Sequence, residues 1–117
     1  MIGPRHFSIS EIVRKWSPRG SSTHSLINDK DGTSMSAGFV FFKDTDIPFT
    51  LWYDEVICCI ATEERFSIVV GDQESVFEPG DMMWLPAKTS LTYRSRGMTT
   101  ALWVVTPPDW EAHRPVS

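Results

Sequence analysis

The fold is decided by a short stretch in the second half of the chain, Gly80-Asp81-Met82-Met83-Trp84-Leu85-Pro86. A turn opens this stretch, because Pro79 presets φ and Gly80 accepts a positive φ, as a type II turn requires. The four residues Met82–Leu85 that follow are expected to form a short strand. A turn leading directly into a strand is the pattern that extends through most of the chain.

From about residue 35 onward, runs of β-branched and aromatic residues alternate with turn residues. The expected strands are Met35–Phe42, Phe49–Tyr53, Glu55–Ala61, Phe66–Val70, Ser75–Phe77, Met82–Leu85, Ser90–Arg94 and Thr100–Thr106. The turns between them include Asp44-Thr45-Asp46, Gly71-Asp72 and Arg96-Gly97. Short strands at this spacing predict an all-β sandwich or closed barrel rather than a parallel sheet.

The start of the chain carries a weaker pattern. Ser8 and Glu11 have the spacing of a capping box, which predicts a two-turn helix that ends before Pro18-Arg19-Gly20. The residues on one face of this helix would be Ile9, Ile12, Val13 and Trp16. An arm that pairs as a strand is the alternative, and Ser17–Thr23 is expected to be a loop.

Length and composition fit one domain of 117 residues, with an N-terminal arm over residues 1–30 and a β-barrel over residues 31–117. The net charge of −4 and the thin spread of lysine and arginine argue against a nucleic-acid partner. No apolar stretch is long enough to span a membrane, and no signal peptide is evident. The adjacent Cys58 and Cys59 are expected to be reduced thiols of a cytoplasmic protein.

The opening stretch and the segment from Glu55 onward resemble the two motifs of the cupin superfamily. In metal-binding cupins the first motif is His-x-His, three or four residues, Glu, six residues and Gly. The second motif is Gly, five residues, Pro, one residue, Gly, two residues and His. This chain keeps Glu55 of the first motif and Gly80, Asp81 and Pro86 of the second. The resemblance implies a single-domain jelly-roll β-barrel with a ligand pocket in its interior.

Counting from these residues gives the side chains at the cupin metal-ligand positions. Phe49 and Leu51 stand at the two histidines of the first motif, and Leu91 stands at the histidine of the second. Glu55 alone is left, and one carboxylate cannot hold a metal that needs three or four convergent ligands. We therefore predict no bound metal and no other cofactor.

A closer resemblance is carried by the segments at both ends of the barrel. Gly32–Phe39, Pro48–Glu55, Ala101–Val105 and the ending Pro107-Pro108-Asp109-Trp110 are similar to the EutQ family of ethanolamine-utilisation cupins. The match covers about 80 residues in order. The family also has an apolar residue at the second-motif histidine position.

The chain departs from the family at two places. Ile60-Ala61-Thr62 replaces the usual Leu-Glu-Gly, and Pro86-Ala87-Lys88 replaces Pro-Lys-Gly. The family has been given an acetate-kinase activity. The chain shows neither a glycine-rich phosphate loop nor an Arg/Lys cluster to stabilise a transferring phosphoryl group, so the resemblance implies fold more than reaction.

Candidate site residues follow from strand alternation, which places Phe49, Leu51, Tyr53 and Glu55 on one side of the strand. The cupin resemblance implies that this side faces the barrel interior. Apolar neighbours would desolvate Glu55 and raise its pKa, which suits general acid/base chemistry. Tyr53 is the second candidate catalytic residue, since its phenol can stabilise an enolate. The predicted ligand-binding residues are Phe49, Leu51, Trp84, Leu91, Tyr93 and Trp103, with Trp52 as a further aromatic wall.

Two functions stay open at this point. One is a metal-independent enzyme acting on a small organic acid or amine, and the other is a non-catalytic cupin that binds a small metabolite or a partner. A phenol or indole hydrogen-bonded to Glu55 in a pocket would favour the enzyme, whereas a barrel filled by side chains would favour the binder. The apolar residues Phe7, Ile9 and Trp16 lead us to expect a homodimer.

Overall fold

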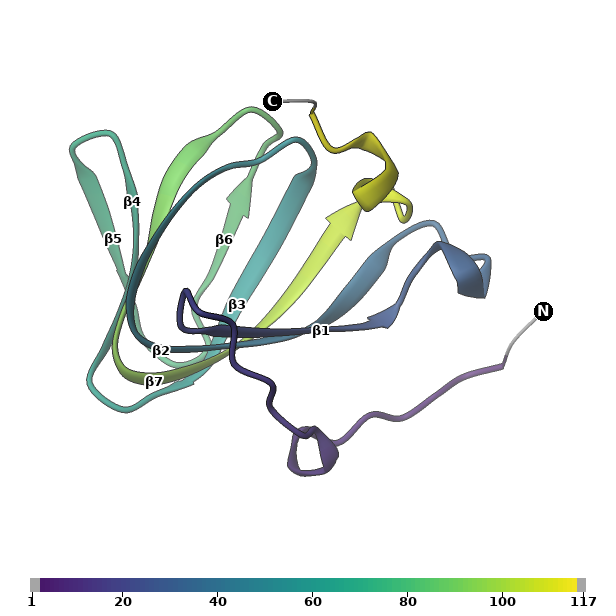
Figure 1. Ribbon diagram of the computed structural model, residues 1–117, viewed down its shortest axis with the longest axis horizontal. Coiled ribbons are helices and arrows are strands. Elements are labelled where there is room, and N and C mark those ends of the chain that lie inside the picture. Colours follow the sequence, from purple (N-terminus) through teal and green to yellow (C-terminus); the bar gives the residue numbers. More distant parts are fainter. Residues whose placement is uncertain (1–2, 116–117) are drawn as a thin grey trace.

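The computed structural model describes residues 3–115, which are almost entirely strands and loops (Figure 1). The strands are β1 (Ser21–Ile27), β2 (Ser36–Thr50), β3 (Asp54–Thr62), β4 (Arg65–Val70), β5 (Gln73–Phe77), β6 (Met82–Leu85) and β7 (Ser90–Thr106). The helical turns are of the 3-10 type: η1 (Ile9–Glu11), η2 (Asp29–Asp31) and η3 (Trp110–His113). No helix in residues 3–115 is long and apolar enough to cross a membrane.

The seven strands form one antiparallel hydrogen-bonded sheet that folds into two halves, called the first and the second sheet below, because the long strands β2 and β7 curve from one half into the other (Figure 1). The first sheet has the order β1-β2-β7-β3-β6, and the second adds β4 and β5 along the other half of β7. Residues 36–43 of β2 pair with residues 98–105, whereas residues 45–50 pair with residues 90–95. The expected jelly-roll class is confirmed, although the pairing described here does not close into a continuous barrel.

The corner between the sheets lies where sequence patterning predicts turns, at Asp44 and Gly97. Both segments instead lie inside continuous strands, so the division of β2 and β7 into separate strands was wrong. The register shifts between Lys43 and Thr45, and the Asp44 carboxylate accepts a hydrogen bond from the Gly97 N–H at 2.7 Å. Asp44 and Gly97 both have positive φ. Turn-forming residues here make a β-bulge that bends paired strands.

The turn that precedes Met82 has the expected geometry, with Gly80 at φ 97°. The Asp81 N–H donates to the Glu78 carbonyl at 2.9 Å, which closes the turn. The Gly80 N–H donates to the Cys59 carbonyl at 2.7 Å, so the turn is attached to β3. The strand that follows, β6, then pairs with β3 and places Leu85 opposite Glu55.

The N-terminal region departs most from expectation. The predicted two-turn helix is reduced to η1, and Ser8 makes no side-chain capping bond. The loop expected over Ser17–Thr23 was wrong from Ser21 onward, where β1 begins and pairs with β2. This strand lies within residues 1–30, which sequence reasoning assigned to the arm. Because β1 is rich in serine and threonine, it lacks the alternating hydrophobic pattern that would have revealed it.

Gly38 on β2 lets β1 approach the sheet closely. A Cβ at this position would clash with the His24 carbonyl oxygen and lie 3.0 Å from a carbon of the Trp103 ring. Because Gly38 has no side chain, both β1 and the Trp103 ring can pack against it.

We expect Gly38→Ala to lower the free energy of unfolding by roughly 1–3 kcal/mol, because the backbone of β1 must shift to admit the methyl group. Chemical denaturation would measure the change. Gly3→Ala is the matched control, since nothing lies within 4 Å of a Cβ there. Equal stability of the two variants would contradict the proposed close approach.

Candidate functional site

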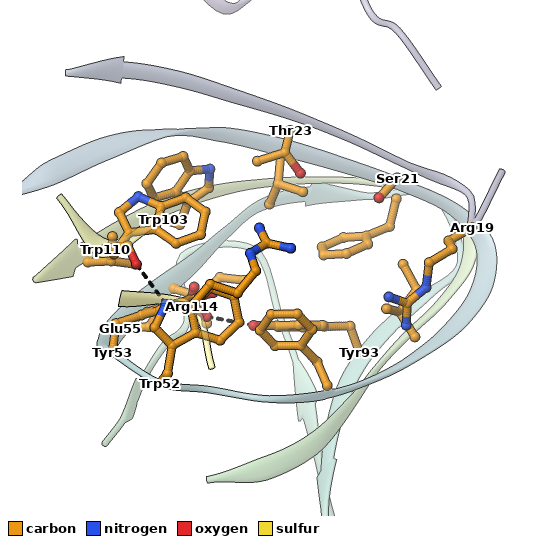
Figure 2. Close-up of a pocket in the computed structure, with 16 residues that line it drawn as sticks. Arg19, Ser21, Thr23, Trp52, Tyr53, Glu55, Tyr93, Trp103, Trp110 and Arg114 are labelled. Carbon is orange, nitrogen blue, oxygen red and sulfur yellow. Dashed lines mark hydrogen bonds between the residues drawn. The ribbon is translucent and has the colours of Figure 1, made fainter. Parts of the chain in front are cut away.

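A cavity of about 260 Å³ lies between β1, the inner faces of β2, β3 and β7, and the C-terminal segment (Figure 2). Its wall is mainly aromatic, with contributions from Phe42, Phe49, Trp52, Tyr53, Tyr93, Trp103 and Trp110. Its charged lining residues are Arg19, Glu55 and Arg114. The interior is therefore not filled by side chains.

Glu55 and Tyr93 form a hydrogen-bonded pair in the cavity wall, drawn as a dashed line in Figure 2. Glu55 comes from β3 and Tyr93 from β7, and the Tyr93 hydroxyl donates to Glu55 Oε1 at 2.8 Å. The glutamate is only 6% exposed. Burial raises the pKa of Glu55 from 4.5 to about 7, against the opposing effect of the Tyr93 hydrogen bond. The carboxyl group therefore exchanges a proton readily near neutral pH.

The two phenols beside Glu55 remain protonated. Burial and the negative charge of Glu55 raise the pKa of Tyr53 and also that of Tyr93. The Tyr53 ring is held between Trp52 and Trp110, with centroid distances of 5.1 and 5.0 Å. A fixed phenol that does not ionise acts as a hydrogen-bond donor to a ligand oxygen.

The C-terminal segment completes the aromatic wall. The Trp52 indole N–H donates to the Trp110 carbonyl at 2.7 Å, which fixes η3 beside the cavity. Trp110 also contacts Trp103, with ring centroids 6.5 Å apart. The Trp103 indole nitrogen is buried without a hydrogen-bond partner among residues 3–115. An unpartnered buried donor costs free energy that a well-placed acceptor would recover.

Among the residues selected from sequence, Phe49, Tyr53, Glu55, Tyr93 and Trp103 are brought together around the cavity. Trp52, expected as an aromatic wall, also lines it.

The other predicted ligand-binding residues lie elsewhere. Leu51 and Leu91 belong to the buried core and do not line the cavity. Trp84 is 64% exposed and lies opposite Val56 of β3, away from the cavity. Strand alternation placed Leu51 on the buried side, and the side chain is 1% exposed, but it packs in the core and does not line the cavity. Its backbone, directly after the end of β2 at Thr50, bonds to that of Thr89 and Lys88.

Sequence reasoning gave no role to Arg19, Arg114 or Trp110 as cavity residues. Each lies outside the strands, in the loop before β1 or in the C-terminal segment. The only available signal was the Pro-x-x-Trp ending, which was used for family resemblance and not for the site.

The side chains at the cupin metal positions do not fit a metal ion. Phe49, Leu51 and Leu91 offer no ligand atom, and Glu55 supplies one carboxylate. Within residues 3–115, no three histidine, cysteine, aspartate or glutamate side chains form a group that could hold a metal. We therefore derive no chemical step through a metal.

The profile of the family described as ethanolamine utilisation protein EutQ matches residues 15–112. The chain belongs to the EutQ family. Two curated EutQ relatives are both called acetate kinase EutQ. The one from Escherichia coli K12 is 29% identical over 87 residues, covering 74% of this chain and 36% of the relative. The one from Salmonella typhimurium LT2 is 28% identical over 87 residues, covering 74% and 37%. The chain thus spans little more than a third of these relatives.

Solved structures share the fold of this EutQ-family chain. A putative EutQ from Salmonella typhimurium LT2 superposes with a TM-score of 0.78 at 22% identity, covering 86% of this chain and 84% of that one. Ectoine synthase from P. lautus gives a TM-score of 0.75 at 22% identity, covering 100% and 94%. At these identities the comparison supports the cupin fold alone.

Glu55 should make the stability of this EutQ-family chain depend on pH. Because its pKa rises from 4.5 to about 7 on folding, the folded chain binds the proton more tightly than the unfolded chain. Its stabilising contribution is complete below pH 4.5 and is lost as pH rises towards 7. We subtract the unfolding free energy of Glu55→Gln from that of the wild type. We expect this difference to fall by about 2–3 kcal/mol as the pH rises from 4.5 to about 7. Denaturant titrations at several pH values measure it, and a pH-independent difference would contradict the raised pKa.

Proposed function

We propose that this chain is a metal-independent cupin of the EutQ family that binds a small organic metabolite in its cavity and transfers a proton through Glu55. The observation that supports this most directly is the buried Glu55–Tyr93 pair in the wall of an unfilled cavity. Of the two functions left open by the sequence, a phenol bonded to Glu55 favours the enzyme over a passive binder.

The arrangement gives each group near Glu55 a distinct role. Tyr93 holds Oε1, and no described residue hydrogen-bonds Oε2, which leaves that oxygen to exchange a proton with the ligand. As a base, Glu55 would take a proton from a carbon next to a carbonyl or similar group, and as an acid it would return one elsewhere. Tyr53 would donate a hydrogen bond to the oxygen on which negative charge develops. This supports proton transfer, isomerisation or elimination as the reaction class.

The aromatic wall supports this chemistry by limiting water. Trp52, Trp103 and Trp110 surround the side of the cavity next to Tyr53 and Glu55 (Figure 2). In such surroundings, the electrostatic and hydrogen-bonding interactions of a bound ligand are stronger than in water. The unpartnered Trp103 indole N–H supports occupation by a molecule that carries an acceptor.

The experiment begins with native mass spectrometry of the isolated protein to identify a co-purifying metabolite. Candidate compounds are then followed by proton NMR in D2O, where catalysed proton abstraction replaces hydrogen with deuterium. We expect Glu55→Gln to slow exchange by roughly 10²–10⁴-fold, since it keeps the shape of the side chain but removes the base. Asp54→Asn is the neighbouring carboxylate control, because Asp54 lies on the exposed side of β3.

Exchange at an unchanged rate in Glu55→Gln would overturn the role of Glu55. Saturable binding of a metabolite with no exchange in the wild type would favour the non-catalytic alternative.

We also propose that the chain is a cytoplasmic homodimer. The reduced thiols support the location, since Cys58 and Cys59 are both free. The outer face of the first sheet supports the dimer, because Met82, Cys58 and Leu102 lie opposite one another on β6, β3 and β7. Trp84 extends this apolar face. On the N-terminal segment, Trp16 is also exposed.

Light scattering should give twice the mass of the chain. Trp84→Glu should shift the distribution towards the monomer, because a charge in an apolar interface is desolvated without a partner. Val76→Glu is the control, since Val76 is also exposed but lies on β5. A monomer mass that does not change with concentration would overturn the dimer.

A further inference from the structure

The charges around the cavity are arranged by sign. Glu55 is the acidic lining residue and is almost completely buried, whereas Arg19 and Arg114 are exposed basic lining residues. In Figure 2, Arg114 reaches across the front of the cavity, and Arg19 lies on the side opposite Trp110. A ligand that enters therefore meets positive charge before it reaches the glutamate.

Neither arginine is neutralised by a carboxylate within residues 3–115. Arg19 donates to the Pro48 carbonyl at 2.8 Å, and the Arg114 guanidinium carbon lies 5.1 Å from the centre of the Trp52 ring. Other arginines of the chain do have acidic partners, namely Arg5, Arg65, Arg94 and Arg96. Arg14 also has no acidic partner among residues 3–115, but it lies over the Phe41 ring and does not line the cavity. The two arginines at the cavity thus keep hydrogen-bond donors available for a ligand.

Guanidinium geometry indicates what these donors would bind. A guanidinium presents a planar fork of N–H groups that matches a carboxylate, and packing against an aromatic ring leaves that fork accessible. The rest of the cavity is mainly apolar and aromatic, with Ser21, Thr23 and the paired Glu55 and Tyr93 as polar groups in its wall. A positively charged ligand would have to pass both arginines, which disfavours an amine.

We propose that the ligand is a small organic carboxylate whose charged group binds Arg114 and Arg19 at the mouth of the cavity. Its apolar body lies against Trp52, Trp103 and Trp110, and its reacting end faces Glu55 and Tyr93. This inference rests on the proposed function, since it takes the cavity as the ligand site. A carboxylate suits the site better than a phosphate, because the cavity lining includes neither lysine nor glycine, whose ammonium and backbone N–H groups hold phosphate in many sites.

The test uses the 117-residue chain and compounds with one shared skeleton. Tryptophan fluorescence and calorimetry measure binding of 3-phenylpropanoate, 3-phenylpropanamide, 3-phenylpropylamine and 2-phenylethyl phosphate. We expect the carboxylate to bind at least about tenfold more tightly than the amide or the amine, and more tightly than the phosphate. Added salt should weaken binding of the carboxylate but leave that of the amide unchanged, since the arginines are exposed.

Arg114→Gln should weaken carboxylate binding by about tenfold without changing amide binding, and Arg114→Lys should restore part of the loss. Arg65→Gln is the control, because Arg65 pairs with Glu74 on the second sheet, away from the cavity. The proposal is overturned if the carboxylate shows no measurable binding or no preference over the amide and the amine. Tighter binding of the phosphate, or an equal effect of Arg114→Gln on all compounds, also overturns it.

Glu55→Gln separates this inference from the proposed catalysis. The variant should keep the preference for the carboxylate, because Arg114 and Arg19 are unchanged. Carboxylate selectivity without proton exchange in the wild type would remove the catalytic role alone. Proton exchange that depends on Glu55 but acts on uncharged compounds equally well would remove the carboxylate assignment alone.

Discussion

The backbone ladder between β2 and β7 runs through both sheets, and β1, β3 and β4 each pair directly with one of these two strands. This ladder must bend where it passes from the first sheet to the second. Asp44 allows the bend, because its carboxylate bonds to the Gly97 N–H while both residues adopt positive φ. A straight ladder would leave two flat layers and no enclosed space, so the cavity is a direct consequence of this corner.

The bend also explains how distant residues form one site. Tyr93 lies before the corner of β7 and Trp103 lies after it, so a single strand contributes to two walls of the cavity. Glu55 lies on β3 of the first sheet and accepts a hydrogen bond from Tyr93. Burial raises the pKa of the carboxyl group, and the phenol limits that rise, which brings the pKa close to neutral pH. The chemistry proposed for Glu55 therefore depends on the same strand curvature that creates the cavity.

Sequence patterning predicted much of the fold because its signals are local. The turn at Gly80 and the following strand depend on backbone preferences of a few adjacent residues, and both are present in the structure. Strand alternation placed Leu51, Tyr53 and Glu55 on the buried side, which is where they lie. It does not distinguish a core residue such as Leu51 from one that lines the cavity, and Trp52, on the other parity, lines the cavity as well because it lies in the loop after β2. Trp84 shows a related limit, since a strand pattern states that two faces exist but not which one meets the cavity.

The arginines of the cavity are the site residues that sequence patterns predict least well. Arg114 reaches the site from a C-terminal segment that packs against distant strands, and the Trp52 indole N–H bonds to the Trp110 carbonyl across 58 positions of the chain. No local pattern records such a contact. At the cupin metal positions, Phe49, Leu51 and Leu91 supply no ligand atom. The remaining Glu55 accepts a hydrogen bond from a tyrosine instead of binding a cation. The positive charge of the cavity lies instead on the exposed Arg19 and Arg114, where we propose that it acts on an entering ligand.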